Sequence, residues 1–369
     1  MDTISHPNTT FTSTLAAVQD AALASPLSIG LAVLLALVPL ASLYRRRSGG
    51  RSKANNYGYG RVEVTKLLVH PIKSCRGTSV ASARYTPEGM ENDRKWCIVD
   101  ADTHQVITAR EVAKMVLITP TLPDATGLLR VSFPSDSPCE PFAVPANPSD
   151  ATLASWVRIF DIKLWGDLVD SYVCEAANEG GRSPSAILSD YFERDVLLVM
   201  KGPKPRLLAP TDAFPNLKGS CVFQDGYPLL VLSEEGLDDI ERELRENVGS
   251  QGIDPRWKEA KLAVERFRPN IVFKGAGPFE EDFWEEIAIG EPSAPGITLV
   301  SKCTRCLLPN VSPETGERDK AVPYKVLLKF RTGLHPKLKM KPCVGCNGVP
   351  KGEGVVRVGD AVWVRKVTR

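Results

Sequence analysis

Two C-x-x-C pairs are the residues in this chain whose types and spacing most clearly suggest chemistry. The first pair lies in CTRCLLPNVSPETG, residues 303–316, and the second in CVGC, residues 343–346. Two such turns can supply the four thiolates of a tetrahedral zinc site. The 36 residues between Cys306 and Cys343 exceed the usual gap of about 15–20 residues. Spacing alone therefore leaves a zinc site open without establishing it.

Basic and polar residues stand beside the first cysteine pair and at the ends of several predicted strands. They lie in four short stretches: CTRC (303–306), RFRPN (266–270), HPIKSCRG (70–77) and NDRKW (92–96). A guanidinium group binds phosphate with two hydrogen bonds, and a cation beside a thiol lowers the thiol pKa. Each of these residues alone is typical of a solvated surface. Together they predict the lining of a site for an anionic, phosphate-bearing cofactor.

The overall charge balance makes this basic chemistry a local feature. The chain has 46 Lys and Arg against 44 Asp and Glu, a net charge of +2, so we expect no nucleic-acid partner. Its four histidines are scattered along the sequence and suggest no histidine-rich metal cluster. With 369 residues, 43% of them hydrophobic, the chain is long enough to fold into two domains.

An uncharged apolar run, LSIGLAVLLALVPLASLY, occupies residues 27–44 and is followed by three arginines. A helix of this length spans about 27 Å, close to the thickness of the hydrocarbon core of a bilayer. The N-terminal tail, residues 1–26, carries no Lys or Arg, unlike a secretory or matrix-targeting leader. We therefore predict a retained transmembrane anchor with the rest of the chain on the cytosolic side. A cleaved or buried apolar segment is the alternative.

A flexible linker is predicted at residues 45–60, RRRSGGRSKANNYGYG, because this stretch is rich in Gly, Ser and Arg and has no periodic apolar pattern. The folded part then begins near Arg61. If this part is cytosolic, its nine cysteines are expected to be reduced thiols or ligands and not a disulfide framework.

Short strand-like runs separated by turn residues dominate the folded part. We predict strands at 62–70, 96–100, 105–108, 128–133, 196–200, 227–233, 266–273, 297–303 and 324–330, and a closing hairpin over 354–367. Helical spacing occurs at 150–160 and 184–195, and Ser233 is placed to cap a further helix. These patterns predict a mostly β chain with some α, in two domains, 61–200 and 201–369, the second a closed or nearly closed barrel.

A set of motifs in a fixed order resembles the MOSC family with its N-terminal β-barrel companion domain. The motifs are VTKLLVHPIKSCRG, DRKWCIVD with VITARE, YPLLVLSEEGLDDI, RFRPNIVF, KCTRCLLPNVSPETG and RVGDAVWV. Within that family the chain is similar to the mitochondrial amidoxime-reducing components, which are molybdenum-cofactor enzymes. The resemblance covers about residues 61–367 and implies an N-terminal MOSC-type β-barrel domain followed by a MOSC β-barrel domain.

The resemblance implies a role for individual residues. The second cysteine of C-x-R-C, here Cys306, would be the protein ligand of molybdenum and the catalytic residue. The other contacts to Mo-molybdopterin would come from Lys73, Ser74, Arg94, Ser233, Arg268, Asn270, Thr304 and Arg305. Thr304 replaces an expected serine and keeps the hydroxyl. Larger departures from the family pattern, at Cys346 and in residues 336–343, concern the rim of the pocket and hence substrate choice.

The activity implied by the resemblance is reduction of N-hydroxylated substrates such as amidoximes. One protein thiolate is enough for the metal, because the pterin supplies two more sulfurs. Electrons would come from cytochrome b5 and NADH-cytochrome b5 reductase, and the membrane would be the mitochondrial outer membrane, with the catalytic part facing the cytosol. Cys303 is expected to be a neighbour of the site, whereas Cys97 and Cys221 are expected to fill the core.

Two functions from other classes stay open. The first is a sulfurase or sulfur carrier acting on the molybdenum cofactor, since MOSC domains also close such enzymes. That activity needs a pyridoxal-phosphate domain, for which the first 60 residues leave no room. The second is a membrane-tethered interaction module in which four cysteines bind zinc.

Overall fold

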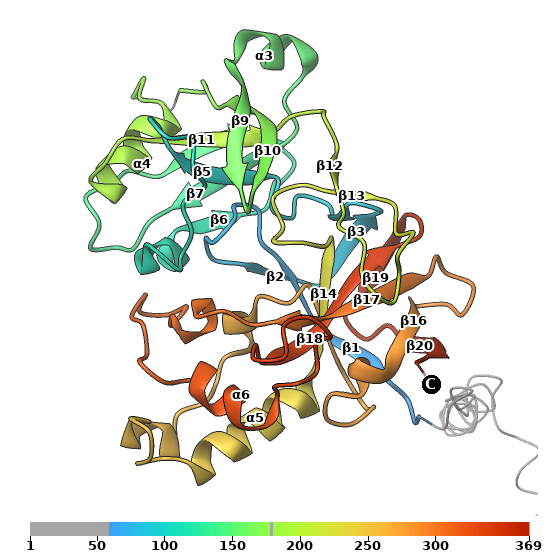
Figure 1. The fold of residues 1–369 in the computed structure, drawn as a ribbon. Helices are drawn as coiled ribbons and strands as arrows, with labels where there is room; N and C mark the ends of the chain where they lie inside the picture. Colours follow the sequence, from blue (N-terminus) through green and yellow to red (C-terminus); the bar gives the residue numbers. More distant parts are fainter. Residues whose placement is uncertain (1–58, 178–179, 369) are drawn as a thin grey trace, which may run out of the picture. The chain divides into compact units, whose positions relative to one another are not determined.

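The computed structural model describes residues 59–177 and 180–368. The predicted tail and anchor, together with nearly all of the linker, lie outside these residues. None of the helices within them is both long and apolar enough to cross a membrane. The described part is mostly β-sheet with a few helices, as predicted (Figure 1).

The largest sheet takes its eight strands from both ends of the chain. In spatial order they are β2 (Thr78–Val80), β1 (Glu63–Val69), β15 (Ile271–Lys274), β14 (Leu229–Ser233), β18 (Cys343–Pro350), β17 (Ile297–Thr304), β16 (Trp284–Ile289) and β20 (Val362–Val367). β14 and β15 are parallel neighbours, whereas β1 pairs with β15 in the antiparallel sense. Backbone hydrogen bonds between Val62 or Val64 and residues 359–362 connect the last strand to the start of the first. The sheet is therefore nearly closed on itself.

Backbone pairing crosses the predicted domain boundary at residue 200. β1 and β2 belong to the large sheet, although they lie in the first segment of the sequence. A second, three-stranded sheet likewise joins β3 (Ser82–Thr86) and β4 (Gly89–Met90) to β19 (Gly354–Arg357) near the C-terminus. The division into 61–200 and 201–369 stays a prediction, because strands from the first segment complete the sheets of the second.

The remaining strands form smaller antiparallel sheets, most of them in the green and cyan part of Figure 1. One contains β5 (Trp96–Asp100), β11 (Val196–Lys201), β10 (Asp167–Val173) and β9 (Arg158–Leu164); the others are β6 (Thr119–Thr121), β7 (Leu128–Ser132) and β8 (Phe142–Pro145), and β12 (Arg206–Leu207) with β13 (Ser220–Cys221). Two helices accompany them, α3 (Asp150–Ser155) and α4 (Pro184–Phe192), with the 3₁₀ turn η2 (Ala113–Leu117).

Strand β5 is buried on both faces because its alternating side chains enter two different cores. Trp96 and Ile98 pack in one cluster, and Cys97 and Val99 pack in another. All four are at most 1% exposed. Fully burying a large apolar side chain adds about 1.5–3 kcal/mol to the free energy of unfolding. The position of β5, and with it that of the residues just before it, is therefore strongly stabilised. The prediction that Cys97 is a core residue is confirmed, and Cys221 is equally buried.

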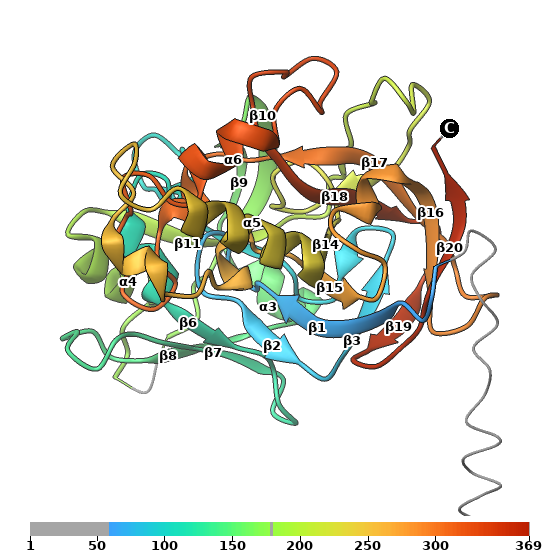
Figure 2. The same cartoon turned by 90° about the horizontal axis from the view of Figure 1, so that it is seen from below.

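Helix α5 (Glu234–Glu246) covers β14 and β15, as Figure 2 shows. Ser233 caps it, since its hydroxyl oxygen accepts the amide of Gly236 at 3.3 Å, as predicted. Ile240 and Leu244 pack into a cluster with residues of the second helix in this region, α6 (Tyr324–Phe330). The short turns nearby are η3 (Pro255–Lys258), η4 (Val264–Phe267), η5 (Glu280–Phe283) and η6 (Leu308–Asn310).

Two predictions near the C-terminus are wrong. Residues 324–330 form helix α6 instead of a strand, because Val326, Leu327 and Phe330 pack at helical spacing into one cluster. The side chain of Asn310 also accepts the first amide of this helix, at Tyr324. Residues 354–367 are not a hairpin, since β19 pairs with β3 and β20 pairs with β16.

Two predictions in the first segment need smaller corrections. Residues 105–108 make only isolated bridges to neighbouring strands and form no strand of their own. The helical pattern over 150–160 is shorter in the structure, since α3 ends at Ser155 and β9 starts at Arg158. Trp156, between the two elements, is buried in the first core and marks the change of direction.

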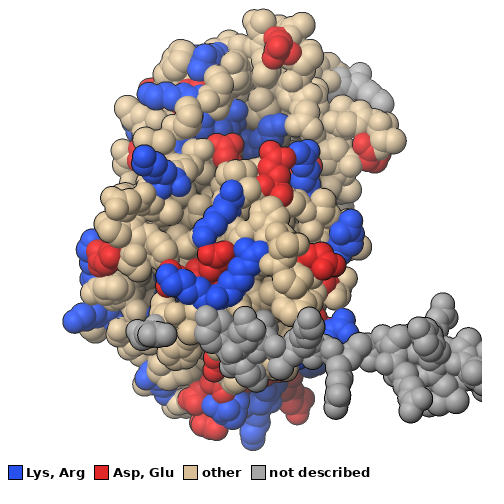
Figure 3. All heavy atoms as spheres, turned by 90° about the vertical axis from the view of Figure 1, so that its right-hand side faces the viewer, with Lys and Arg blue, Asp and Glu red and all other residues tan. Residues whose placement is uncertain are grey.

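Charged side chains on the face shown in Figure 3 are interspersed and not segregated by sign. This agrees with the net charge of +2. Several of the exposed charges are paired, for example Arg84 with Glu353 and Arg182 with Asp190, both at 2.5 Å. Exposed pairs of this kind add little stability.

One buried carboxyl stands out beneath helix α5. Glu281 is fully buried, and its Oε1 accepts the amide of Ser233 at 3.3 Å, whereas its Oε2 has no hydrogen-bond partner among the described residues. Burial raises the pKa of Glu281 to about 7, and the charge of Asp282 adds to the effect. Glu281 therefore holds its proton in the folded state at a pH where the unfolded chain has lost it.

This shift predicts that Glu281 destabilises the fold as the pH rises. Below its ordinary pKa of 4.5 the carboxyl is protonated in both states, and between 4.5 and about 7 only the native state keeps the proton. The free energy of unfolding should thus fall over this window by up to about 3 kcal/mol. Glu281→Gln should lack this fall in urea unfolding at pH 5 and pH 7.5, whereas Glu280→Gln serves as the half-exposed control. Parallel profiles for wild type and Glu281→Gln would contradict the assignment.

Candidate functional site

A cavity of about 110 Å³ collects the sequence-predicted site residues from distant parts of the chain. Its lining includes eight of the nine residues proposed from the sequence: Lys73, Ser74, Arg94, Arg268, Asn270, Thr304, Arg305 and Cys306. Ser233 is the exception and does not line it. The sequence placed these residues near strand ends, and the structure brings those ends together.

Most of the sequence-predicted lining residues lie just before or after a strand, whereas Thr304 is the last residue of β17. Lys73 and Ser74 lie just after β1, and Arg94 lies just before β5. Arg268 and Asn270 lie between η4 and β15, and Cys306 follows β17. The amide of Lys73 donates to the carbonyl of Trp96 at 2.8 Å, which joins the first two groups directly. Loops held at both ends by buried strands can keep side chains in fixed positions.

Three of these residues have a left-handed backbone conformation. The φ angles are 68° at Ser74, 49° at Arg94 and 57° at Arg268. For a residue other than glycine this conformation costs about 1–2 kcal/mol. Such strain persists only where the surroundings enforce it, and it is concentrated at functional sites. Three of the nine residues other than glycine with a left-handed backbone in the described part of the chain therefore line this cavity, which makes it the candidate site.

The buried carboxylate of Asp93 holds this arrangement together. Its Oδ1 accepts the backbone amide of His70 at 2.8 Å, and its Oδ2 accepts Nη1 of Arg94 at 2.5 Å. Arg94 in turn donates to Oδ1 of Asn270 at 3.1 Å and to the carbonyl of Arg268 at 3.0 Å. Burial acts to raise the pKa of Asp93, but Arg94 and His70 outweigh it and lower that pKa to about 2. Asp93 is therefore ionised and bridges the β1 end to the Arg268 loop.

The imidazole of His70 is neutral in this network. Burial is the largest cause that lowers its pKa well below the ordinary value, and the charges of Arg94 and Arg268 act in the same direction. His70 is 1% exposed, so its ring is part of the packed interior. Gly77 is required next to it, because a Cβ at that position would come within 2.5 Å of the imidazole.

The four cysteines of the two C-x-x-C pairs have different environments. Cys306 is half-buried, lines the cavity, and accepts the amide of Leu308 at 3.5 Å. Cys303 accepts Nη1 of Arg305 at 3.1 Å, yet burial still raises the pKa of its thiol. Burial also raises the pKa of Cys343 to about 11, and Cys346 donates to the carbonyl of Glu281 at 3.2 Å. Cys303 and Cys306 are both partly exposed and both line the cavity. Of these two thiols, only that of Cys303 is bonded to Arg305.

The geometry does not support a four-cysteine metal site. Within residues 59–177 and 180–368, no group of three or more His, Cys, Asp or Glu side chains is placed to hold a metal ion. Cys343 lies opposite Thr304 in the pairing of β17 with β18, and Cys346 lies opposite Lys302. Successive pairs along two strands spread the thiols along the sheet, whereas a tetrahedral site needs them around one point.

The structure adds cavity residues that sequence reasoning missed. They are Gln224, Asp225, Gly226 and Tyr227, in the loop after β13, and Asn347 on β18, together with several apolar residues, whereas Cys303 lies at the cavity as expected. The carboxylate of Asp225 forms an ion pair with Lys73, whose Nζ also donates to the carbonyl of Phe223 at 2.8 Å. The dipeptide Asp225-Gly226 after a short strand was the available signal, since it is a common turn sequence.

The two partners of this ion pair have opposite exposures. The Lys73 side chain is 6% exposed, whereas that of Asp225 is 66% exposed and faces the cavity. Burial lowers the pKa of Lys73, and the charge of Asp225 opposes this change. Although desolvation acts to raise the pKa of Asp225, the charge and hydrogen bond of Lys73 outweigh it and lower that pKa. Both groups are therefore charged at neutral pH, and the carboxylate is the accessible one.

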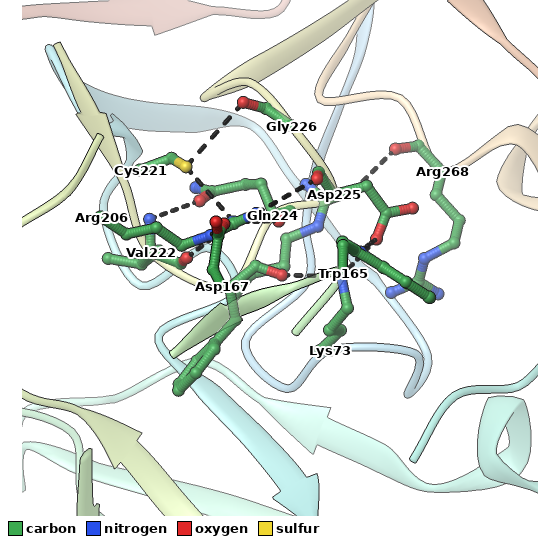
Figure 4. Close-up of polar contacts among 12 residues, drawn as sticks. Lys73, Trp165, Asp167, Arg206, Cys221, Val222, Gln224, Asp225, Gly226 and Arg268 are labelled. Atoms are coloured by element: carbon green, nitrogen blue, oxygen red, sulfur yellow. Dashed lines mark hydrogen bonds and ion pairs between the residues drawn. The ribbon is translucent and has the colours of Figure 1, made fainter. Parts of the chain in front are cut away.

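Arg206 organises the loop that carries Asp225, as Figure 4 shows. Its guanidinium donates to the carbonyl of Gln224 at 2.7 Å and to the carboxylate of Asp167 at 2.7 Å. A weaker bond reaches the carbonyl of Asp225 at 3.4 Å. Asp167 begins β10, so this arginine fixes the cavity loop to the β9–β10 hairpin.

The residues of the cavity fit an anionic cofactor that needs one protein thiolate. Four cationic side chains line it, those of Lys73, Arg94, Arg268 and Arg305, and Asp225 is the carboxylate among the lining residues. Two of the guanidinium groups have buried nitrogen atoms with no partner in the described part of the chain, Nη2 of Arg268 and Nε of Arg305. Burial lowers the pKa of Arg268, but only to about 10, so it stays charged. Unpartnered buried donors of this kind favour an anion as ligand.

Two family models match the chain. The model of the MOSC N-terminal beta barrel domain matches residues 61–177, and that of the MOSC domain matches residues 218–363. The second match contains Arg268, Asn270 and Cys306, and the first contains Lys73 and Arg94. The cavity therefore takes residues from both matched segments.

Three relatives align with most of the chain. Mitochondrial amidoxime reducing component 2 of Rattus norvegicus is 31% identical over 346 residues, covering 91% of this chain and 92% of that protein. Mitochondrial amidoxime-reducing component 1 of Mus musculus is 29% identical, covering 91% and 92%. Mitochondrial amidoxime reducing component 2 of Homo sapiens is 29% identical, covering 92% and 93%. The similarity thus extends over both matched domains.

The position of Ser233 outside the cavity gives a testable prediction. Its hydroxyl caps α5 and also accepts the amide of Phe279 at 3.3 Å, so Ser233→Ala should lower the free energy of unfolding by about 1 kcal/mol. Cofactor content per folded protein should not change. Ser183→Ala, which removes the cap of α4, is the matched control. A selective loss of cofactor in Ser233→Ala would show that this residue contacts the cofactor after all.

Proposed function

Because the chain belongs to the MOSC-domain family that includes the mitochondrial amidoxime-reducing components, we propose that it is a molybdenum-cofactor reductase of N-hydroxylated substrates such as amidoximes. One observation carries the proposal. The half-buried thiol of Cys306 shares a cavity with four cationic side chains. This combination suits a metal that takes one protein sulfur and a pterin that carries a phosphate.

Different residues of the cavity would bind different parts of the molybdenum cofactor. When bound, the molybdenum cofactor supplies a redox-active metal with two pterin sulfurs, able to exchange oxygen. Cys306 would provide the protein thiolate. Lys73, Arg94, Arg268 and Arg305 would bind the phosphate and the pterin, with hydrogen bonds from Ser74, Asn270 and Thr304. The strained loops keep these donors in place before the ligand arrives, which lowers the ordering cost of binding.

The overall reaction removes one oxygen atom from the substrate. Reducing an N–OH group to N–H takes up two electrons and two protons and releases one water. Asp225 is ionised at neutral pH and accessible from the cavity, so it can accept a hydrogen bond from the N–H or O–H of a substrate. We assign the protons to solvent water, which reaches the exposed Asp225 side chain. Ser74 and Thr304 supply further hydroxyl groups at the wall.

We further propose cytochrome b5 and NADH-cytochrome b5 reductase as the electron source. The chain carries no C-x-x-C-H haem motif and no G-x-G-x-x-G motif, so its electrons must come from a separate protein. We place the protein at the mitochondrial outer membrane with its catalytic part in the cytosol. The names of the aligned relatives support a mitochondrial location, and the apolar run at 27–44, followed by three arginines, supports an anchor with the rest of the chain in the cytosol.

Metal analysis tests the proposed cofactor. The full-length protein, purified from cells that make the molybdenum cofactor, should contain about one molybdenum per chain and release a fluorescent oxidised pterin on denaturation. Arg268→Ala should lower both contents together, because it removes a buried cation of the cavity. Stoichiometric zinc without pterin would overturn the proposal and favour the four-cysteine module.

A pair of cysteine variants tests the proposed metal ligand. With a reconstituted cytochrome b5 chain, Cys306→Ser should lower the rate at which benzamidoxime is converted to benzamidine by more than about 100-fold, because the single protein thiolate is lost. Cys343→Ser is the matched control. Its thiol is buried and bonds to the carbonyl of Lys341, so activity per folded protein should stay within about twofold. Equal loss in both variants would contradict a single-thiolate site.

A further inference from the structure

An exposed tryptophan, Trp165, contacts the lining of the cavity. Trp165 lies at the tip of the β9–β10 hairpin, where the register pairs Leu164 with Asp167 and leaves a two-residue turn. Its side chain reaches Asp225, since the indole Nε1 donates to Oδ1 of that carboxylate at 3.2 Å (Figure 4). Asp225 lines the cavity, whereas Trp165 lies one hydrogen bond outside it. The ring therefore contacts two residues of the cavity lining, Asp225 and Lys73.

The turn is unusual for a tryptophan. Trp165 and Gly166 have φ angles of 54° and 97°, as a type I′ turn requires. Asn-Gly or Asp-Gly is preferred there, because a bulky side chain in the left-handed region is strained. Local turn preference therefore does not explain the tryptophan. A strained residue beside a functional cavity points to a role for its side chain.

The indole ring is exposed but fixed in orientation. It is 46% exposed, which is high for so large a side chain. The guanidinium of Arg110 stacks over it, with its central carbon 3.9 Å from the ring centroid, and Nζ of Lys73 is 5.7 Å from the ring. The hydrogen bond to Asp225 fixes one edge of the ring, and the arginine fixes its plane.

The hairpin itself is attached to the cavity loop. Asp167, directly after the turn, forms an ion pair with Arg206, whose side chain is 8% exposed. Arg206 also binds the carbonyl of Gln224 in the cavity loop. On the other strand, Nζ of Lys163 donates to the carbonyl of Thr103 at 2.9 Å. The position of Trp165 relative to Asp225 is thus determined by several bonds.

From these observations we propose that Trp165 is a positioning residue that stacks against the part of a substrate extending beyond the cavity. The inference rests on the proposed reductase function. It assigns the substrate class as N-hydroxylated compounds with a planar aromatic substituent, because an oriented aromatic ring binds such a group by stacking. A small substrate held entirely inside the cavity would not contact Trp165. The residue would therefore affect selectivity between large planar and small substrates.

Three variants separate the ring from its surroundings. Trp165→Asn removes the ring and creates the preferred Asn-Gly turn, so the hairpin should stay folded. Trp165→Phe keeps an aromatic ring but loses the hydrogen bond to Asp225. Phe160→Ala is the control, because Phe160 lies on the same hairpin, is 62% exposed and stacks on Arg158, which binds Asp170.

Steady-state kinetics of the molybdenum-loaded full-length enzyme should be measured with benzamidoxime and with hydroxylamine. Trp165→Asn should raise KM for benzamidoxime roughly 2- to 10-fold, with KM for hydroxylamine and kcat for both within about twofold. Trp165→Phe and Phe160→Ala should resemble wild type. An equal change for both substrates, no change, or a Phe variant as impaired as the Asn variant would overturn the proposal.

A binding measurement gives a second readout that needs no turnover. Benzamidine, the product of benzamidoxime reduction, should quench the fluorescence of wild-type protein, and Trp165→Phe should lose most of this signal while keeping similar affinity by calorimetry. Trp165→Asn should bind benzamidine roughly 2- to 10-fold more weakly. If wild type reduces neither substrate, the proposed function fails while this binding result still tests Trp165. Unchanged affinity in Trp165→Asn would overturn the stacking role.

Discussion

The bond between the buried carboxylate of Asp93 and the guanidinium of Arg94 is the interaction on which the rest of the site depends. Through it the end of β1, the start of β5 and the loop before β15 become one unit. A buried ion pair is costly to desolvate, and it is tolerated here because every oxygen of the carboxylate is used. Three strained residues around the cavity can then keep their left-handed conformations.

The cavity carries more positive charge than its own carboxylates neutralise. Nη2 of Arg268 and Nε of Arg305 are buried without a hydrogen-bond partner in the described part of the chain, and this leaves a desolvation cost in the folded protein. An anionic cofactor that accepts these hydrogen bonds would remove that cost and would stabilise the fold by binding only the native state. Cofactor binding and stability are thus expected to be coupled in this protein. Cys306 is the half-buried thiol at this wall, whereas burial raises the pKa of the thiols of Cys303, Cys343 and Cys346.

Much of the cavity was predictable because its charged residues lie next to predicted strands, whose ends come together when the strands pair. The stretches around Lys73, Arg94 and Arg268 follow or precede apolar runs, and they converge once those runs pair in sheets. Asp225 and Asn347 escaped prediction, since a turn carboxylate and a strand asparagine carry no signal until their neighbours are known. The strand predicted at residues 324–330 failed for a related reason. A short apolar segment fits the two-residue repeat of a strand and the 3.6-residue repeat of a helix equally well. Packing of Val326 and Leu327 into one cluster stabilises the helix.

The amino-acid sequence by itself determined the β-rich class of the fold and indicated most of the cationic residues of the site, because these properties depend on residue types and local spacing. Cys306 was singled out among the four thiols by the resemblance of the motifs to the MOSC family. Only the tertiary structure decided that β1, β2 and β3 complete sheets built from the C-terminal half. It also decided that Trp165 donates a hydrogen bond to Asp225, and that Ser233 caps helix α5 and does not line the cavity. Pairing between distant segments sets these contacts, and no local pattern in the chain encodes which partners will meet.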